Sequence, residues 1–199
     1  MNLGSPRDVV IGVSDLAATA AFGPQVWEAF LAASRFTRLV VLEAGDTGWH
    51  KIHSVFSWVR MWGASIGLAY ACQATATVAL GGALIWLWRG GAPFALKAAG
   101  FCLVAILATP YSLDYDMMVL APAIAFFAAD ALARGFRPWE KTALAVLWLM
   151  PLLARSIASA TLVPLGVPAM LAVLVALLIP RCSKFGWNRS LALIRRPMT

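Results

Sequence analysis

The chain has 199 residues, of which 61% are hydrophobic and only 13% are charged, and its formal net charge is +7. So little charge excludes an ordinary soluble domain of this length. The positive balance raises the question of nucleic-acid binding, but the placement of the basic residues, described below, argues against that partner.

The first sixty residues contain no confident membrane span. The apolar stretch 9–22 is short and is interrupted by Asp15. Pro24 suits the first position of a short helix, whose apolar face would contain Trp27, Phe30 and Leu31. We therefore predict that residues 1–63 form an exterior, interfacial segment of short amphipathic helices.

Residues 50–62, HKIHSVFSWVRMW, have helical periodicity. On one helix their polar side chains fall in a narrow sector made of His50, His53, Ser57 and Arg60. A tryptophan-rich helix at the start of a span is typical of one lying in the membrane interface. No cysteine or carboxylate completes a metal-binding set with the two histidines, so we predict no metal site.

Residues 64–180 are predicted to form a transmembrane helix bundle. A helix needs about 20 apolar residues to cross the hydrocarbon core. About five segments approach this requirement, namely 64–88, 94–109, 117–133, 139–154 and 164–180. The fold class predicted is an all-α, polytopic membrane protein.

Basic residues alternate between the loops of this bundle. The loops 89–97 and 134–141 and the predicted tail 181–199 hold ten of the sixteen Lys and Arg: Arg89, Lys97, Arg134, Arg137, Lys141, Arg181, Lys184, Arg189, Arg195 and Arg196. The loops 110–116 and 155–163 hold only Arg155. By the positive-inside rule the first group faces the cytoplasm and the second the exterior. Membrane topology, rather than nucleic acid, explains the net charge.

The stretch TPYSLDYDMMVLAP, residues 109–122, places two carboxylates and two tyrosines in an apolar region. Pro110 predicts a helix end and a turn through residues 111–116. In one interpretation Asp114 caps the next helix and the tyrosines join the interfacial aromatic belt. In the other, the acids and phenols line a polar cavity. An extended turn would point both carboxylates the same way, whereas a helical turn would make them diverge by about 200°.

Two stretches carry a family resemblance: FGPQVWEAFLAASRFTRLVVLEAGDTGWHKIHSVFSWVRMWG and ATPYSLDYDMMVLAPAIAFFAADALARGFRPWEK. They resemble glycosyltransferase family 87, whose members are polytopic membrane proteins with the C-type glycosyltransferase fold. The resemblance implies transfer of a hexose, typically mannose, from a polyprenyl-phosphate donor at the exterior face of the bacterial plasma membrane. It implies no cofactor.

An inverting displacement needs a carboxylate base and cations that hold the departing phosphate. We expect Arg60, His53 and Ser57 to bind the donor phosphate, and Asp114, Asp116, Tyr111 and Tyr115 to bind sugar. The resemblance covers only the C-terminal half of the family pattern, and it places the presumed catalytic acid in an earlier exterior loop. We assign no catalytic residue here. We expect either a partial chain or a separate chain that supplies the N-terminal half, and as partners the donor and membrane lipids.

Two other functions stay open at this point. One is a non-catalytic membrane subunit or lipid-binding partner. The other is a transporter or channel, which is disfavoured because no span shows the paired broken helices or buried mid-membrane carboxylates of such proteins.

Overall fold

The computed structural model describes the backbone of residues 6–178 and the side chains of residues 13–178. Regular structure in this range is helical, apart from one isolated antiparallel bridge. The predicted all-α fold is confirmed. The helices form two compact units, Met1–Asp46 and Thr47–Thr199, each described here by itself. The predicted boundary at residue 63 stays a prediction, and the basic tail 181–199 lies outside the described residues.

The first unit contains α1 (Pro6–Phe22), α2 (Gln25–Phe36) and the π-helical turn η1 (Thr37–Glu43). The chain turns at Gly23, which adopts a φ of 81° that favours glycine, and Pro24 caps the start of α2. The indole Nε1 of Trp27 donates to Oγ1 of Thr19 at 2.9 Å. The predicted apolar face of α2 is exposed within this unit: Trp27, Phe30 and Leu31.

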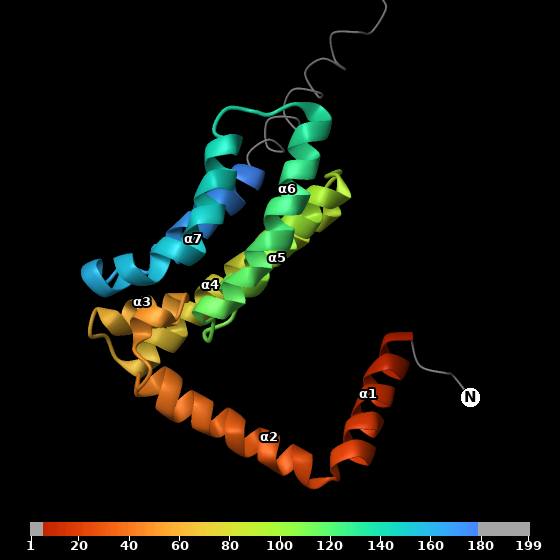
Figure 1. The fold of residues 1–199 in the computed structure, drawn as a ribbon, viewed down its shortest axis with the longest axis vertical. Coiled ribbons are helices and arrows are strands. Elements are labelled where there is room, and N and C mark those ends of the chain that lie inside the picture. Colours follow the sequence, from red (N-terminus) through yellow and green to blue (C-terminus); the bar gives the residue numbers. More distant parts are fainter. Residues whose placement is uncertain (1–5, 179–199) are drawn as a thin grey trace, which may run out of the picture. The chain divides into compact units, whose positions relative to one another are not determined.

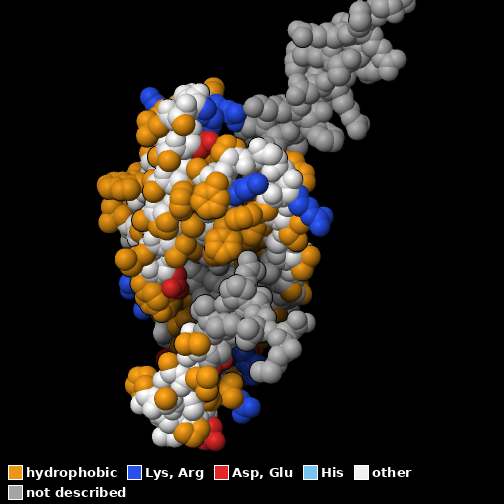
Figure 2. All heavy atoms as spheres, turned by 90° about the vertical axis from the view of Figure 1, so that its right-hand side faces the viewer, with side chains coloured by type: hydrophobic (Ala, Val, Ile, Leu, Met, Phe, Trp, Pro, Cys, Tyr) orange, Lys and Arg blue, Asp and Glu red, His pale blue; other side chains and the backbone are white. Residues whose placement is uncertain are grey.

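The second unit begins with the short turn η2 (Trp49–Lys51) and α3 (Val55–Met61). Long apolar helices follow, and Figure 1 shows that they pack side by side. They are α4 (Ile66–Arg89), α5 (Phe94–Ala108), η3 (Asp114–Val119) continuing into α6 (Leu120–Arg134), α7 (Glu140–Thr161) and a helix over Gly166–Leu178. Hydrophobic side chains cover most of the flank visible in Figure 2.

Three helical segments of the described part are long and apolar enough to cross a membrane: Ile66–Arg89, Asp114–Arg134 and Glu140–Thr161. Phe94–Ala108 and Gly166–Leu178 are apolar but shorter. The five segments predicted from the sequence therefore each correspond to a helix, and three of them meet the length needed for a span.

The core of the bundle centres on α5. Eight of its residues are buried, including Leu103 and Leu107, and it packs against both α4 and α6. Phe127 of α6, Leu147 of α7 and Met170 of the Gly166–Leu178 helix complete the same apolar cluster. A mostly apolar helix with buried residues along its length is expected at such a central position, while α4 leaves large apolar side chains on its outer surface.

The helix α7 is longer than predicted. It runs to Thr161, past the expected end at residue 154, so the assignment of Arg155 to a loop is wrong. Two buried alanines, Ala154 and Ala158, continue the packed face through this extension. The hydroxyl of Thr161 donates to the carbonyl of Ile157 within the last turn. Pro151 lies inside the helix, and Figure 1 shows a change of direction along α7, as expected at proline.

A compact charge cluster joins α6 to α7 at the end of the bundle opposite α3. Arg134 donates through Nε to Asp130 at 2.6 Å and through both terminal nitrogens to Glu140. The carboxylate of Glu140 also accepts from the backbone N–H of Arg137. Both acids are largely buried. Each charge of this cluster is therefore paired inside the loop connection that it stabilises.

Candidate functional site

The start of α3 and the loop after α5 meet at one end of the bundle. Ile52 pairs with Leu113 in the isolated antiparallel bridge, and the backbone N–H of His53 donates to the carbonyl of Ser112 at 2.7 Å. Pro110 ends α5, as predicted, with Thr109 in an extended conformation. The two segments that carry the predicted site residues are thus brought together, although they are far apart in sequence.

This pairing corrects the helix predicted over residues 50–62. His50 lies in η2, residues 52–54 are not helical, and α3 begins only at Val55. Ser54 starts α3 with a capping box: its Oγ accepts from the N–H of Ser57 at 3.1 Å, and Ser57 Oγ accepts from the N–H of Ser54. The bridge and the cap supply hydrogen bonds that the helix would otherwise provide, so the extended conformation wins there.

His53 and Asp114 form the polar centre of this end. Nε2 of His53 lies 2.9 Å from Oδ1 of Asp114. The histidine side chain is fully buried, whereas Asp114 is about one third exposed. Because a carboxylate accepts, Nε2 carries the proton of this hydrogen bond. Nδ1 of His53 is buried and has no hydrogen-bond partner among the described residues.

Gly166 allows the Gly166–Leu178 helix to approach His53. A Cβ atom at this position would lie 3.0 Å from Cε of Met117 and 3.3 Å from Nδ1 of His53. A larger residue here would push against both side chains. The imidazole ring is therefore held between Asp114 and the backbone of the Gly166–Leu178 helix.

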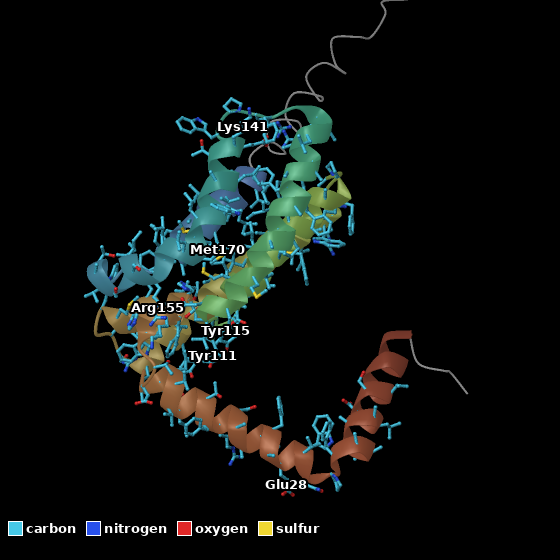
Figure 3. The ribbon with its side chains drawn as sticks, in the orientation of Figure 1. Glu28, Tyr111, Tyr115, Lys141, Arg155 and Met170 are labelled. Carbon is cyan, nitrogen blue, oxygen red and sulfur yellow. The ribbon has the colours of Figure 1, made fainter. Side chains whose placement is uncertain are left out.

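Arg155 faces the same carboxylate from α7. Its Nη1 lies 3.7 Å from Oδ2 of Asp114, and its side chain is 55% exposed. Figure 3 shows Arg155 at the same end of the second unit as Tyr111 and Tyr115, with Lys141 at the opposite end. Asp114 thus lies between a buried histidine and an exposed arginine.

Asp116 has a different role from Asp114 in the structure. Its Oδ2 accepts from the backbone N–H of Leu113 at 2.8 Å and so caps η3. Of the two conformations considered for this turn, the helical one forms from Asp114 onward, since residues 114–119 form a 3₁₀ helix. Residues two apart on such a helix point about 120° apart. The capping role considered for Asp114 falls to Asp116.

The two tyrosines lie beside these acids. Tyr111 is half-buried and Tyr115 is 63% exposed. Partial burial raises the pKa of the Tyr111 phenol above its ordinary value, and the neighbouring Tyr115 and Asp116 raise it further. The Tyr111 phenol therefore stays neutral at physiological pH and keeps a proton to donate.

The residues predicted to bind the donor phosphate occupy different environments. The hydroxyl of Ser57 is fully buried and is used at the start of α3, where it also donates to the carbonyl of Ser54. Arg60 is half-buried; its guanidinium stacks on Trp49 at 4.6 Å, and Nη1 donates to the carbonyl of Ala64 at 2.6 Å. His53 is turned toward Asp114. Of the three, Arg60 is the one that reaches the surface.

Gln73 is a polar residue of this end that was missed in the sequence. Its Oε1 accepts from the N–H of Phe56 at 3.1 Å, and its Nε2 donates to the carbonyls of Leu107 and Ala108 at 3.0 and 3.2 Å. It therefore joins the start of α3 to α4 and to the end of α5. The available signal was a lone amide, with Thr77 four residues later, inside an uncharged apolar span.

Within the described range, no group of three or more His, Cys, Asp or Glu side chains is placed to hold a metal ion. The chemical capacity of this end therefore rests on its acids, its histidine, its arginines and its phenols. Such a set can bind hydroxyl-rich and anionic ligands.

Comparison with protein families gives one match. Residues 9–110 match the model of glycosyltransferase family 87, a little over half of the chain. No curated protein and no solved structure matches. The match includes His53, Ser57 and Arg60 and stops immediately before Tyr111.

Proposed function

Because this chain belongs to glycosyltransferase family 87, we propose that it binds a polyprenyl-phosphate-linked hexose and takes part in transferring the sugar to an acceptor. The observation that carries this proposal is the convergence of His53, just before α3, and Arg155 of α7 on Asp114. That convergence gathers anion-binding and hydroxyl-binding groups at one end of an apolar bundle, where a lipid-linked sugar phosphate would meet the aqueous phase.

Arg60 is proposed to contact the donor phosphate. It lies on α3, beside the start of the first long span, and its planar fork can donate two parallel hydrogen bonds to phosphate oxygens. His53 and Ser57 were expected to share this contact. In the proposed arrangement they do not contact the phosphate. The capping by Ser57 and the pairing of His53 with Asp114 fix the direction of the helix that carries Arg60.

Asp114, Asp116, Tyr111 and Tyr115 are proposed to face the sugar. Carboxylate oxygens accept from sugar hydroxyls, and a neutral phenol can donate to them. The raised pKa of Tyr111 supports a donor role for its phenol. No residue of this chain is proposed as the base that activates the acceptor, and the expectation that a separate N-terminal half supplies it stays a prediction. So does the C-type arrangement of helices.

The proposed location is the bacterial plasma membrane, with the site end facing the exterior. The support is the distribution of charge: Arg89, Lys97, Arg137 and Lys141 lie at or next to the two connections of the opposite end. The positive-inside rule assigns such an end to the cytoplasm.

Binding of the donor carrier tests the proposal. The purified chain in lipid nanodiscs is exposed to polyprenyl phosphate and, separately, to the uncharged polyprenol, and adducts are counted by native mass spectrometry. The proposal expects selective retention of the phosphate form. Equal retention of both lipids, or of neither, would contradict it. A non-catalytic lipid-binding subunit would also retain the phosphate form, but it would not restore transfer of labelled mannose when the chain is combined with an N-terminal half from a relative.

A further inference from the structure

We infer that Arg155 is a second phosphate-binding residue for the lipid-linked donor, at the border between the site and the lipid-facing surface of α7. The ligand class is a lipid phosphate ester, a chemistry that membrane phospholipids share. The inference rests on the function proposed above, and it concerns a residue to which neither the family resemblance nor the family match assigns a role.

Arg155 lies at a position on α7 where an unpaired guanidinium is energetically unfavourable. The packed face of the helix consists of Leu147, Met150, Ala154 and Ala158. Arg155 stands beside this face with its side chain 55% exposed, near Leu152, which is 74% exposed. It lies six residues before the end of the helix, or about 9 Å along its axis. A guanidinium on the exposed surface of a helix apolar enough to span a membrane is unfavourable next to lipid without an anionic partner.

The partner that Arg155 has in the structure is a weak one. Asp114 approaches only Nη1, at 3.7 Å, which is longer than a charge-assisted hydrogen bond of about 2.8 Å. The other oxygen of Asp114 already accepts from His53. Arg155 can therefore turn to another anion without breaking a short hydrogen bond, and Asp114 would remain held by the histidine.

Arg134 at the opposite end shows what a structural arginine looks like in the same bundle. Its guanidinium donates to both Asp130 and Glu140, and its side chain is 23% exposed. The positive charge of Arg134 is paired with carboxylates of both α6 and α7. Arg155 has one distant carboxylate and more than twice the exposed fraction, which is the arrangement expected of a residue that exchanges its partner for a ligand.

Arg60 stacks on Trp49 of η2, and η2 packs against α7, the helix that carries Arg155. In the proposed arrangement both arginines contact one phosphate. Asp114, next to Arg155, then lies where the sugar attached to that phosphate would be. When sugar transfer leaves a free phosphate monoester with additional negative charge, two guanidinium groups stabilise it better than one. Arg155 would thus favour the leaving group of the reaction as well as the bound donor.

The test compares Arg155→Ala and Arg155→Lys with Arg89→Ala, which removes an exposed arginine at the other end of the bundle. Affinity for polyprenyl phosphate is measured in nanodiscs made of zwitterionic phospholipid. Loss of a guanidinium–phosphate contact should weaken binding by about tenfold in Arg155→Ala, with partial recovery in Arg155→Lys. The Arg89→Ala protein should bind like the wild type, and thermal unfolding of all three should show that they are folded.

The outcomes separate this inference from the function on which it rests. If Arg155→Ala binds normally while Arg60→Ala binds weakly, Arg155 is excluded and the proposed function remains. If the wild type binds no polyprenyl phosphate, both fall. Repeating the measurement in nanodiscs that contain phosphatidylglycerol tests the source of the phosphate. If phosphatidylglycerol competes with polyprenyl phosphate for the wild type and not for Arg155→Ala, Arg155 binds lipid headgroups in general. That result would overturn its assignment to the donor.

Discussion

Nε2 of His53 lies 2.9 Å from Oδ1 of Asp114, and this contact joins the approach to α3 with the start of η3. The histidine is fully buried, so the hydrogen bond is protected from water on one side. It links parts of the chain that come from the two stretches carrying the family resemblance. The stability of the site end should therefore depend on this pair.

We expect a double-mutant cycle of His53→Ala and Asp114→Ala to give a coupling free energy of about 1 kcal/mol or more, because each substitution leaves the other group without its partner. Equilibrium unfolding in detergent micelles measures it. The cycle Ser34→Ala with Ser159→Ala, two exposed positions whose hydroxyls bond only within their own helices, should be additive. An additive result for the histidine–aspartate pair would contradict the prediction.

Gly166→Ala should lower the free energy of unfolding by about 1–3 kcal/mol, since its Cβ would crowd Met117 and His53. Gly81→Ala is the matched control, because nothing lies within 4 Å of a Cβ at that helical position. Alanine there should be neutral or should stabilise the helix by up to about 1 kcal/mol. Chemical unfolding of both variants decides, and equal effects would argue against close packing at Gly166.

Gln73→Leu should destabilise the second unit by about 2–3 kcal/mol, because the buried N–H of Phe56 and the carbonyl of Leu107 lose their partner. Thr75→Val is the control. Its hydroxyl is exposed and bonds only to the carbonyl of Ala71 in the same helix, so a change within about 0.5 kcal/mol is expected. A Gln73→Leu protein as stable as the wild type would show that these hydrogen bonds are replaceable.

Asp116→Asn separates the cap from a role in sugar binding. Asparagine keeps an oxygen that accepts from the N–H of Leu113, so stability should hardly change, whereas Asp116→Ala should cost about 1 kcal/mol. If Asp116 also binds sugar, Asp116→Asn should reduce mannose transfer in the reconstituted protein while the melting temperature stays constant. Full transfer by Asp116→Asn would show that the Asp116 carboxylate serves only as a cap of η3.

Single cysteines can test the predicted topology. In a background without native cysteines, Tyr115→Cys should react with an impermeant maleimide in intact cells, because Tyr115 is exposed at the site end. Lys141→Cys, at the opposite end, should react only after the membrane is permeabilised. Labelling of Lys141→Cys alone in intact cells would invert the proposed orientation.

The sequence was sufficient for the class of fold, and the two stretches that it singled out meet in the structure. Long uncharged runs predict helices without reference to tertiary contacts, and Pro110 marks the end of α5. The details around Ile52 and Asp114 were not predictable, because they depend on the bridge to Leu113. Residues 50–62 satisfy helical periodicity, but the long-range bridge, with its hydrogen bond from the N–H of His53 to the carbonyl of Ser112, competes successfully with it.

The predicted end of α7 was wrong for a related reason. Arginine at position 155 after an apolar run is a typical signal for the end of a span, yet the buried alanines on the neighbouring positions keep the helix packed for two further turns. Arg155 therefore entered the candidate site only through the structure. Gln73 and Gly166 were missed because their importance depends on tertiary contacts that the sequence does not show.

The cluster of Arg134 with Asp130 and Glu140 has a consequence for how the chain is inserted. Topogenic charge acts while spans enter the membrane one after another, before Glu140 on the following helix can reach Arg134. In the orientation proposed above, Arg134 would at that stage add to the positive charge that keeps this end on the cytoplasmic side. Once α6 and α7 pack, the cluster carries one positive and two negative charges and no longer adds to the basic surface. In that orientation the same residue would contribute to insertion first and would join α6 to α7 afterwards.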